Sequence, residues 1–299
     1  MLNSHSQIAF TPETHFIRKH IANIKEQKLF KNCKYNILKN SLLKDPELNR
    51  IDIDIKALIK NQLSSSPSLT QFYKLFLSNH LEYKQKQIIG DKDPKNLEHL
   101  DQIKRIYPSA KIIHIIRDPR DVVLSRLKAE WSKDRGITIH ALTYQLQYQK
   151  ACRDGSRLFG ENYFEIQYEN LITDPHSTLA GLCSFLGIPY EKNMLNFYKN
   201  SWEIVKDEEK NWKAECFQPV KSNNLNKWKK KLSPAAIYLI ENISHSVFKE
   251  NRYQRSDSLK AVRFTTKIKS RIIKIILPLI NFFYKLYHRI KDHCLKKYL

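Results

Sequence analysis

Short apolar runs in the first two thirds of the chain predict buried β-strands. The clearest run is Lys111–Ile116, in which four isoleucines surround His114. Two further runs are Gln87–Gly90 and Tyr163–Tyr168. Each run is short, rich in β-branched or aromatic residues, and followed by residues that favour a turn, which is the pattern of strands buried in a sheet. We therefore expect strands at these three positions.

Helical patterns separate the expected strands. Apolar residues recur there at spacings of three and four, as on the buried face of a helix. The alternation of strands with helices predicts an α/β fold with a mainly parallel sheet flanked by helices. Helices are expected over 96–107, 121–131, 139–158, 175–186, 190–200 and 234–251, mostly helical structure over 30–81 with a break at 64–67, and a long loop over 206–228.

A strand-to-helix junction at Arg117 carries informative polar residues. The run I-I-H-I-I-R-D-P-R-D-V-V-L-S ends a strand at Arg117, and Asp118 and Pro119 suit the start of the next helix. Arg117 thus leaves the carboxyl end of a parallel strand, where open α/β sheets bind ligands. Ser125 follows about two helical turns later, and an arginine with a hydroxyl beside a helix N-terminus suits a phosphate. The alternative is an ordinary turn with an exposed arginine.

Three further segments, taken with this junction, resemble a known enzyme family. They are G-D-K-D-P at 90–94, Y-E-N-L-I-T-D-P at 168–175 and L-C-S-F-L-G-I at 182–188. Their order and spacing over residues 1–250 resemble the sulfotransferases that use 3'-phosphoadenosine-5'-phosphosulfate (PAPS), in particular the tyrosylprotein sulfotransferases and their bacterial relatives. The resemblance implies a P-loop nucleotide-kinase-like three-layer fold. It also implies PAPS as co-substrate and transfer of a sulfuryl group to a hydroxyl or amine acceptor without a metal.

The resemblance assigns four residues to the cofactor. Arg117 and Ser125 would hold the 3'-phosphate of PAPS, and Tyr168 would contact the nucleotide. Lys227 lies in a segment that resembles a Ser-Lys-Trp stretch over the cofactor, and it would face the 3'-phosphate. In this segment Asn226 stands where the relatives have serine. The alternative for Tyr168 is a core tyrosine at the end of a strand.

The same resemblance assigns two residues to catalysis. Glu13 falls where the relatives carry the glutamate that takes the proton of the acceptor, a role for a general base. His15 is a second choice for this base. Lys92 matches a lysine that neutralises charge developing on the transferred group. The alternatives are a glutamate that merely favours a helix N-terminus capped by Thr11, and a solvated loop lysine.

The spacing of cysteines and histidines matches no metal site. The five cysteines include no C-x-x-C pair, and the eleven histidines form no H-E-x-x-H motif. We therefore expect reduced cysteines, no disulfide framework and no metal. The N-terminal residues lack the pattern of a secretory signal. These features predict a cytoplasmic protein.

The formal net charge of +22 predicts an anionic partner. Such a field attracts phosphorylated cofactors, polyanions and anionic lipids alike. A nucleic-acid-binding protein is a rival class, but no zinc-finger, RNP or helix-turn-helix signature is present, and we expect no nucleic-acid partner. The acceptor, whether a glycan, a peptide or a small molecule, is not specified by the sequence.

The C-terminal residues 259–299 predict a basic amphipathic tail, separate from a sulfotransferase domain over residues 1–258. The apolar segment 272–287 is shorter than the about 20 apolar residues of a membrane span, and basic residues flank it from 267 to 291. Two interpretations are open. Either the tail lies on an anionic membrane surface, which would make the protein peripheral to the membrane, or it packs on the domain with a solvated basic face.

One feature of the related enzymes is missing from the sequence. They begin with a strand and a Gly-x-x-Arg-Ser-Gly-Thr-Thr-like loop that cradles the 5'-phosphosulfate. No glycine precedes Gly90, so we expect that strand and loop, a segment on the order of 20–30 residues, to be absent. Either the true start lies upstream, or the chain is an inactive truncated remnant that binds nucleotide or polyanion without catalysis. For the chain as given we expect weak or no catalysis.

Overall fold

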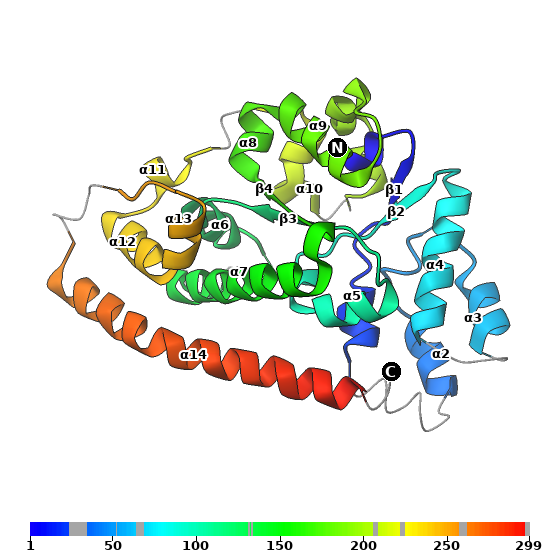
Figure 1. Cartoon of the computed structure of the whole chain (residues 1–299), viewed down its shortest axis with the longest axis horizontal. Coiled ribbons are helices and arrows are strands. Elements are labelled where there is room, and N and C mark those ends of the chain that lie inside the picture. Colours follow the sequence, from blue (N-terminus) through cyan, green and yellow to red (C-terminus); the bar gives the residue numbers. More distant parts are fainter. Residues whose placement is uncertain are drawn as a thin grey trace. The chain divides into compact units, whose positions relative to one another are not determined.

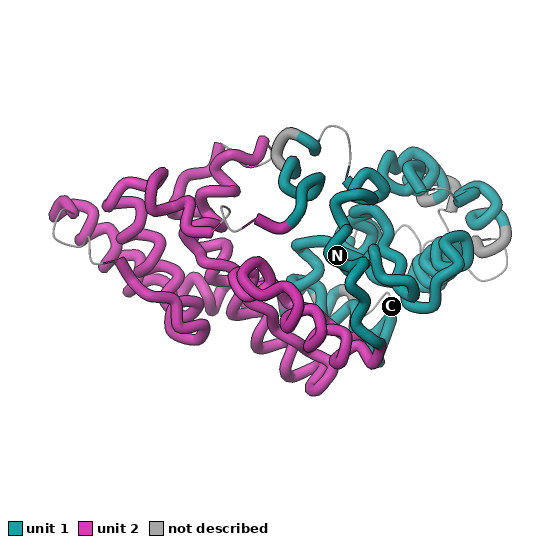
Figure 2. The backbone as a smooth tube through the Cα atoms, turned by 90° about the horizontal axis from the view of Figure 1, so that it is seen from above, with its two compact units in different colours: residues 1–110, 189–219, 289–299 teal, residues 111–188, 220–288 magenta. Residues whose placement is uncertain are grey.

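Two parallel pairs of β-strands, each surrounded by helices, organise the chain (Figure 1). The pairs belong to two compact units (Figure 2). Unit 1 comprises residues 1–110, 189–219 and 289–299, and unit 2 comprises residues 111–188 and 220–288. The computed structural model describes residues 1–23, 35–51, 53–63, 69–130, 132, 134–205, 209–221, 225–256 and 262–296.

The strand pair of unit 1 consists of β1 (Ile8–Phe10) and β2 (Ile88–Gly90). In their register Phe10 lies opposite Gly90. A Cβ atom on Gly90 would lie 2.3 Å from a ring atom of Phe10, so the ring occupies the place of a side chain there. The sequence predicted β2 but not β1, because three residues are too few to show a periodic pattern.

An aromatic stack attaches the segment after β1 to helix α4 (Leu69–Tyr83). The ring of Phe16 lies 4.8 Å from that of Tyr73 and 5.7 Å from that of Phe72, and all three side chains are buried. Because Phe16 follows Glu13 and His15 closely, this stack restricts where those two polar residues can lie. Aromatic pairs of this kind contribute about 0.5–1.5 kcal/mol beyond their burial.

The remaining elements of unit 1 are short. The predicted helix over 190–200 is present as a 3₁₀-helix. The predicted loop over 206–228 is wrong in part, because residues 210–217 form helical turns and Trp228 begins a helix of unit 2. Residues 206–208 and 222–224 lie outside the described residues. The predicted break at 64–67 also lies outside them.

The helical elements of unit 1 are α2 (Tyr35–Leu43), α3 (Ile55–Leu63), α5 (Leu100–Ile106), α10 (Lys210–Lys213), a π-helical turn (Ile17–Ile21) and 3₁₀ turns at Leu2–Ser4, Asn96–Glu98, Lys192–Lys199, Ser201–Glu203 and Ala214–Phe217.

The strand pair of unit 2 confirms both remaining predicted strands. Strand β3 (Ile112–Ile116) runs parallel to β4 (Tyr163–Gln167), with their last residues opposite each other. Helix α6 (Pro119–Arg126) follows β3 and ends earlier than the predicted 121–131. At its end the Ser132 hydroxyl donates to the Arg126 carbonyl at 2.6 Å, which satisfies an acceptor left without a helical partner. Residue 131 lies outside the described residues.

Helices cover the strand pair of unit 2 and share a core. Val123, Ala141, Ile240, Ile243 and Ile273 form one buried cluster. The predicted helix over 234–251 is instead two helices that meet at residue 244. The helices of unit 2 after α6 are α7 (Ile137–Phe159), α8 (Tyr168–Thr173), α9 (Pro175–Leu186), α11 (Trp228–Lys231), α12 (Pro234–Ile243), α13 (His245–Glu250) and α14 (Phe264–Lys296), of which α14 belongs to unit 2 as far as His288.

Helix α14 contains most of the predicted basic tail. Ile273 and Leu277 are buried, and Ile273 belongs to the core cluster of unit 2, so one face of the helix packs on this unit. The predicted domain boundary at residue 258 stays a prediction. Within the described residues, no helix combines the length and the apolar character that crossing a membrane requires.

The close approach of Phe10 to Gly90 gives a stability test. We expect Gly90→Ala to lower the free energy of unfolding by about 1–3 kcal/mol, because the added methyl group overpacks the site. Urea unfolding measures the change. The control is Gly181→Ala within α9, where an added Cβ meets no atom within 4 Å and helix propensity favours alanine by about 1 kcal/mol. Equal losses in both variants would contradict the packing argument.

Candidate functional site

Arg117 and Tyr168 meet at the carboxyl ends of the two strands of unit 2. Each residue directly follows its strand, so the parallel register places them side by side. The guanidinium carbon of Arg117 lies 4.3 Å from the centroid of the Tyr168 ring. Both side chains are half-buried, and the stacking restrains the guanidinium group without using its N–H donors. The structure therefore brings together two of the four predicted cofactor residues.

The backbone of Arg117 is held by a residue that no sequence pattern predicted. The hydroxyl of Tyr144, on α7, accepts a hydrogen bond from the Arg117 N–H at 3.1 Å and donates to the Arg117 carbonyl at 2.9 Å. Burial raises the pKa of Tyr144 well above its ordinary value, so the hydroxyl keeps its proton. No motif marks this tyrosine, because it lies on a different element from the junction that it supports.

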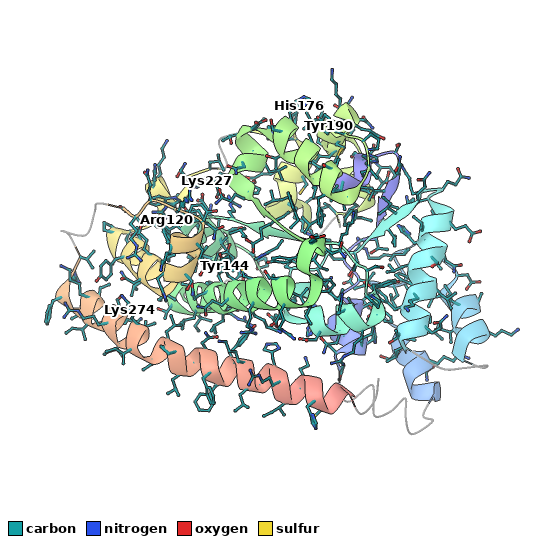
Figure 3. All side chains as sticks on the ribbon, in the orientation of Figure 1. Arg120, Tyr144, His176, Tyr190, Lys227 and Lys274 are labelled. Carbon is teal, nitrogen blue, oxygen red and sulfur yellow. The ribbon has the colours of Figure 1, made fainter. Side chains whose placement is uncertain are left out.

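Lys227 lies next to α6, the helix that carries Ser125. The carboxylate of Asp121 on α6 binds the backbone on both sides of Lys227. It accepts from the N–H of Asn226 at 2.9 Å and from that of Trp228 at 3.0 Å. Figure 3 labels Lys227 in the same part of unit 2 as Arg120 of α6. Ser125 itself is exposed on α6. The segment that carries Lys227 is thus attached to α6 through its backbone.

The second arginine of the R-D-P-R sequence is structural. Arg120 is buried, and its guanidinium group donates to Asp118 and to Glu241, each at 2.7 Å. The same group lies 3.7 Å from the centroid of the Trp228 ring. This cluster ties α6 to α11 and α12. Removing one partner of such a buried pair costs about 3–5 kcal/mol, because the other charge stays buried.

A cavity of about 610 Å³ with a mixed polar and apolar lining opens beside these residues in unit 2. Its size falls within the range of small-molecule sites. It contains none of the four predicted cofactor residues, but it is lined by the immediate sequence neighbours of three of them, Arg117, Tyr168 and Lys227. The lining includes Asp118, Glu169, Asn226, Trp228, Tyr253 and Arg255.

The two predicted catalytic residues form an ion pair in unit 1. The Glu13 carboxylate accepts from the ammonium group of Lys92 and, at 3.1 Å, from that of Lys213. The side chain of Glu13 is 13% exposed, whereas that of Lys92 is 52% exposed. The sequence gives no signal for Lys213, because this residue lies on α10 within a stretch predicted to be a loop and belongs to no motif.

The two lysines determine the charge of Glu13. Burial alone would raise the pKa of this carboxyl, but the nearby ammonium groups outweigh burial and lower the pKa below its ordinary value. Glu13 is therefore ionised at neutral pH. Lys213 also donates to Glu209 at 2.9 Å, and despite its burial the two carboxylates raise its pKa.

A buried aspartate next to Lys92 organises the loop after β2. Asp93 accepts from His15 Nδ1 at 2.8 Å and from Arg18 Nε at 3.1 Å. Its burial would raise its pKa, but the His15 contact and the other hydrogen bonds lower the pKa to about 2. His15 has a φ of 56°, which is uncommon for a residue other than glycine. His15 thus positions the loop that carries Lys92.

Two groups of side chains in the described part of the chain have the atoms to bind a metal ion. The first group is Glu13, His15 and Asp93 in unit 1, and the second is His114, Cys152 and Glu165 in unit 2. In the first group the ammonium groups of Lys92 and Lys213 already bind the Glu13 carboxylate, so a cation would have to displace them. In the second group the Cys152 thiol and the Tyr163 hydroxyl donate to Glu165.

Comparison with known proteins identifies related sequences. Residues 1–192 match the model of the family described as "Sulfotransferase family". A "Putative protein-tyrosine sulfotransferase" of Caenorhabditis elegans is 29% identical over 108 residues, which are 35% of this chain and 42% of that protein. "Omega-hydroxy-beta-dihydromenaquinone-9 sulfotransferase Stf3" of Mycobacterium bovis is 27% identical over 120 residues, 36% of this chain and 30% of that protein. The chain spans less than half the length of the curated relatives it matches.

A solved structure shares the fold. The "Sulfotransferase Domain from the Curacin Biosynthetic Pathway" superposes with a TM-score of 0.62 at 18% identity, covering 85% of this chain and 92% of that chain. The α/β class with parallel strands is thereby confirmed. The family model covers more than half of the 299 residues and agrees with the resemblance seen in the sequence. The chain belongs to the sulfotransferase family.

Proposed function

We propose that the protein transfers a sulfuryl group from PAPS to a hydroxyl or amine acceptor. The observation that supports this most directly is the stacking of Arg117 on Tyr168 at the carboxyl ends of two parallel strands. Ligands of open α/β sheets bind at these ends, and a restrained guanidinium group can form two parallel hydrogen bonds to a phosphate. We also propose the three-layer arrangement of nucleotide kinases for the fold.

The donor site combines the residues that the family resemblance assigns. Arg117 and Ser125 hold the 3'-phosphate of PAPS, Tyr168 contacts the nucleotide, and Lys227 adds a positive charge toward the same phosphate. The attachment of residues 226–228 to Asp121 supports this role of Lys227, because it keeps the lysine next to the helix of Ser125. The net charge of +22 favours a donor with several phosphate charges.

The transfer step uses Glu13 and Lys92. The acceptor oxygen or nitrogen attacks sulfur in line, the bond from sulfur to the bridging phosphate oxygen breaks, and the acceptor proton passes to the Glu13 carboxylate. Lys92 stabilises the negative charge on the departing phosphate. Lys92 and Lys213 both lower the pKa of Glu13, so the loss of either contact would raise this pKa and make Glu13 a stronger base.

The nucleotide site is tested by removing the guanidinium group. We expect Arg117→Ala to weaken binding of 3',5'-adenosine bisphosphate by on the order of tenfold to a hundredfold, since a hydrogen bond to a charged group contributes about 1.5–3 kcal/mol. Titration calorimetry measures the affinity. The matched control is Arg157→Ala, on the exposed surface of α7 in the same unit. Equal affinity of Arg117→Ala and wild type would reject this phosphate site.

The base is tested by an isosteric change. We expect Glu13→Gln to lower the weak PAPS turnover of the chain by about 10²–10⁴-fold while nucleotide affinity stays unchanged. Release of the bisphosphate product is measured with a panel of hydroxyl and amine acceptors. The control is Glu209→Gln, which removes the other carboxylate bound to Lys213. If wild type binds the nucleotide but turns over no acceptor, the protein is a nucleotide-binding protein without catalysis, and the proposed transfer is wrong.

Lys213 is expected to set the basicity of Glu13. In Lys213→Met the pKa of Glu13 should rise, because burial is then opposed by Lys92 alone. In wild type the pKa of Glu13 is lower in the folded protein than the unfolded value of 4.5, so its carboxylate stabilises the fold above that pH. This stability is lost as the pH falls through the folded pKa. The variant should lose the same stability at a higher pH. A ¹³C titration of the glutamate carboxyl measures the shift, with exposed Lys199→Met as the control.

A further inference from the structure

Helix α14 carries a row of apolar side chains that faces solvent. One side of the helix is buried on unit 2 through Ile273, and the Asn281 side chain donates to Gln149 of α7 at 3.0 Å. Ten large apolar side chains between Phe264 and Tyr287 are nevertheless 37% to 76% exposed. Six of them recur at helical spacing and form what we call the apolar stripe: Phe264, Ile268, Ile272, Ile275, Leu279 and Phe282.

A basic row accompanies the apolar stripe. Lys267, Arg271 and Lys274 follow one another at spacings of four and three residues, which places them on one side of α14. Figure 3 labels Lys274 on this helix. Residues 264–288 contain five lysines and arginines and no aspartate or glutamate. The helix therefore has a buried side, an exposed apolar side and a cationic side.

This combination favours one kind of partner. Exposed apolar patches of this extent mark sites of protein or membrane contact, and an apolar side next to a cationic side is the pattern of helices that lie in a membrane interface. A second copy of the chain would bring two cationic rows without acidic residues close together, which is unfavourable. An anionic lipid surface supplies both hydrocarbon and negative charge.

We propose that α14 attaches the protein to membranes that contain anionic lipids. The apolar stripe enters the boundary between headgroups and acyl chains, and Lys267, Arg271 and Lys274 contact lipid phosphates. The helix lies in the plane of the membrane, which agrees with the finding that no described helix is long and apolar enough to cross it. This attachment does not depend on the proposed sulfuryl transfer.

Flotation of the full chain with vesicles tests the apolar stripe. We expect wild type to float with phosphatidylcholine vesicles that contain about a third phosphatidylserine, and to float weakly with phosphatidylcholine alone. The triple variant Ile275→Ser, Leu279→Ser, Phe282→Ser should stay at the bottom of the gradient. The control is the triple variant Tyr83→Ser, Ile139→Ser, Trp202→Ser, which changes exposed apolar residues outside α14. Thermal unfolding verifies that both variants are folded.

A charge variant tests the preference for anionic lipid. Lys267→Gln, Arg271→Gln, Lys274→Gln should weaken partition into the anionic vesicles by on the order of a hundredfold, because each basic residue near the surface contributes to binding. Raising the salt concentration to about 1 M should weaken wild type similarly. The control replaces Lys192, Lys199 and Lys249, which are exposed on other elements, with glutamine.

Three results would overturn the proposal. The first is wild type that fails to float with the anionic vesicles, and the second is a serine variant that floats as well as wild type. The third is a dimer in sedimentation equilibrium that the serine substitutions dissociate, with no flotation of wild type. In that case the apolar stripe binds a second copy of the chain instead of lipid.

Discussion

The parallel register of β3 with β4 is the constraint on which the candidate donor site depends. It aligns the last residues of the two strands, so that the residues following them, Arg117 and Tyr168, stack on each other. A slip by one residue would turn every side chain of one strand to the opposite face and would separate the pair. The buried side chains of Ile116 on β3 and Ile166 on β4 oppose such a slip, because the slip would turn one of them out of the core of unit 2.

Charge is distributed differently in the two units. In unit 2 a buried guanidinium group, that of Arg120, is balanced by two carboxylates and serves the fold. In unit 1 a single carboxylate, that of Glu13, is shared by two ammonium groups, one of which is half exposed. The first arrangement is costly to disturb because every partner is desolvated. The second can exchange a partner, since an exposed lysine is readily bound by another anion.

The sequence was sufficient for the elements with strong local patterns. Both strands of unit 2, the junction at Arg117 and the family were predicted, because a run of isoleucines followed by R-D-P-R is a local signal. Strand β1 could not be predicted, because its three residues become a strand only by pairing with β2. Lys213, Tyr144 and Asp121 were missed for the same reason: each acts on residues far along the chain, and only tertiary structure reveals those contacts.

The contact between Tyr144 and Arg117 fixes the backbone of residue 117 and leaves its side chain uninvolved. Tyr144 holds only main-chain atoms of residue 117, so the position of that residue does not depend on which side chain it carries. The side chain at residue 117 can therefore change during evolution while the strand end keeps its place. A junction built in this way tolerates substitution at the position proposed to contact the donor without first losing its fold.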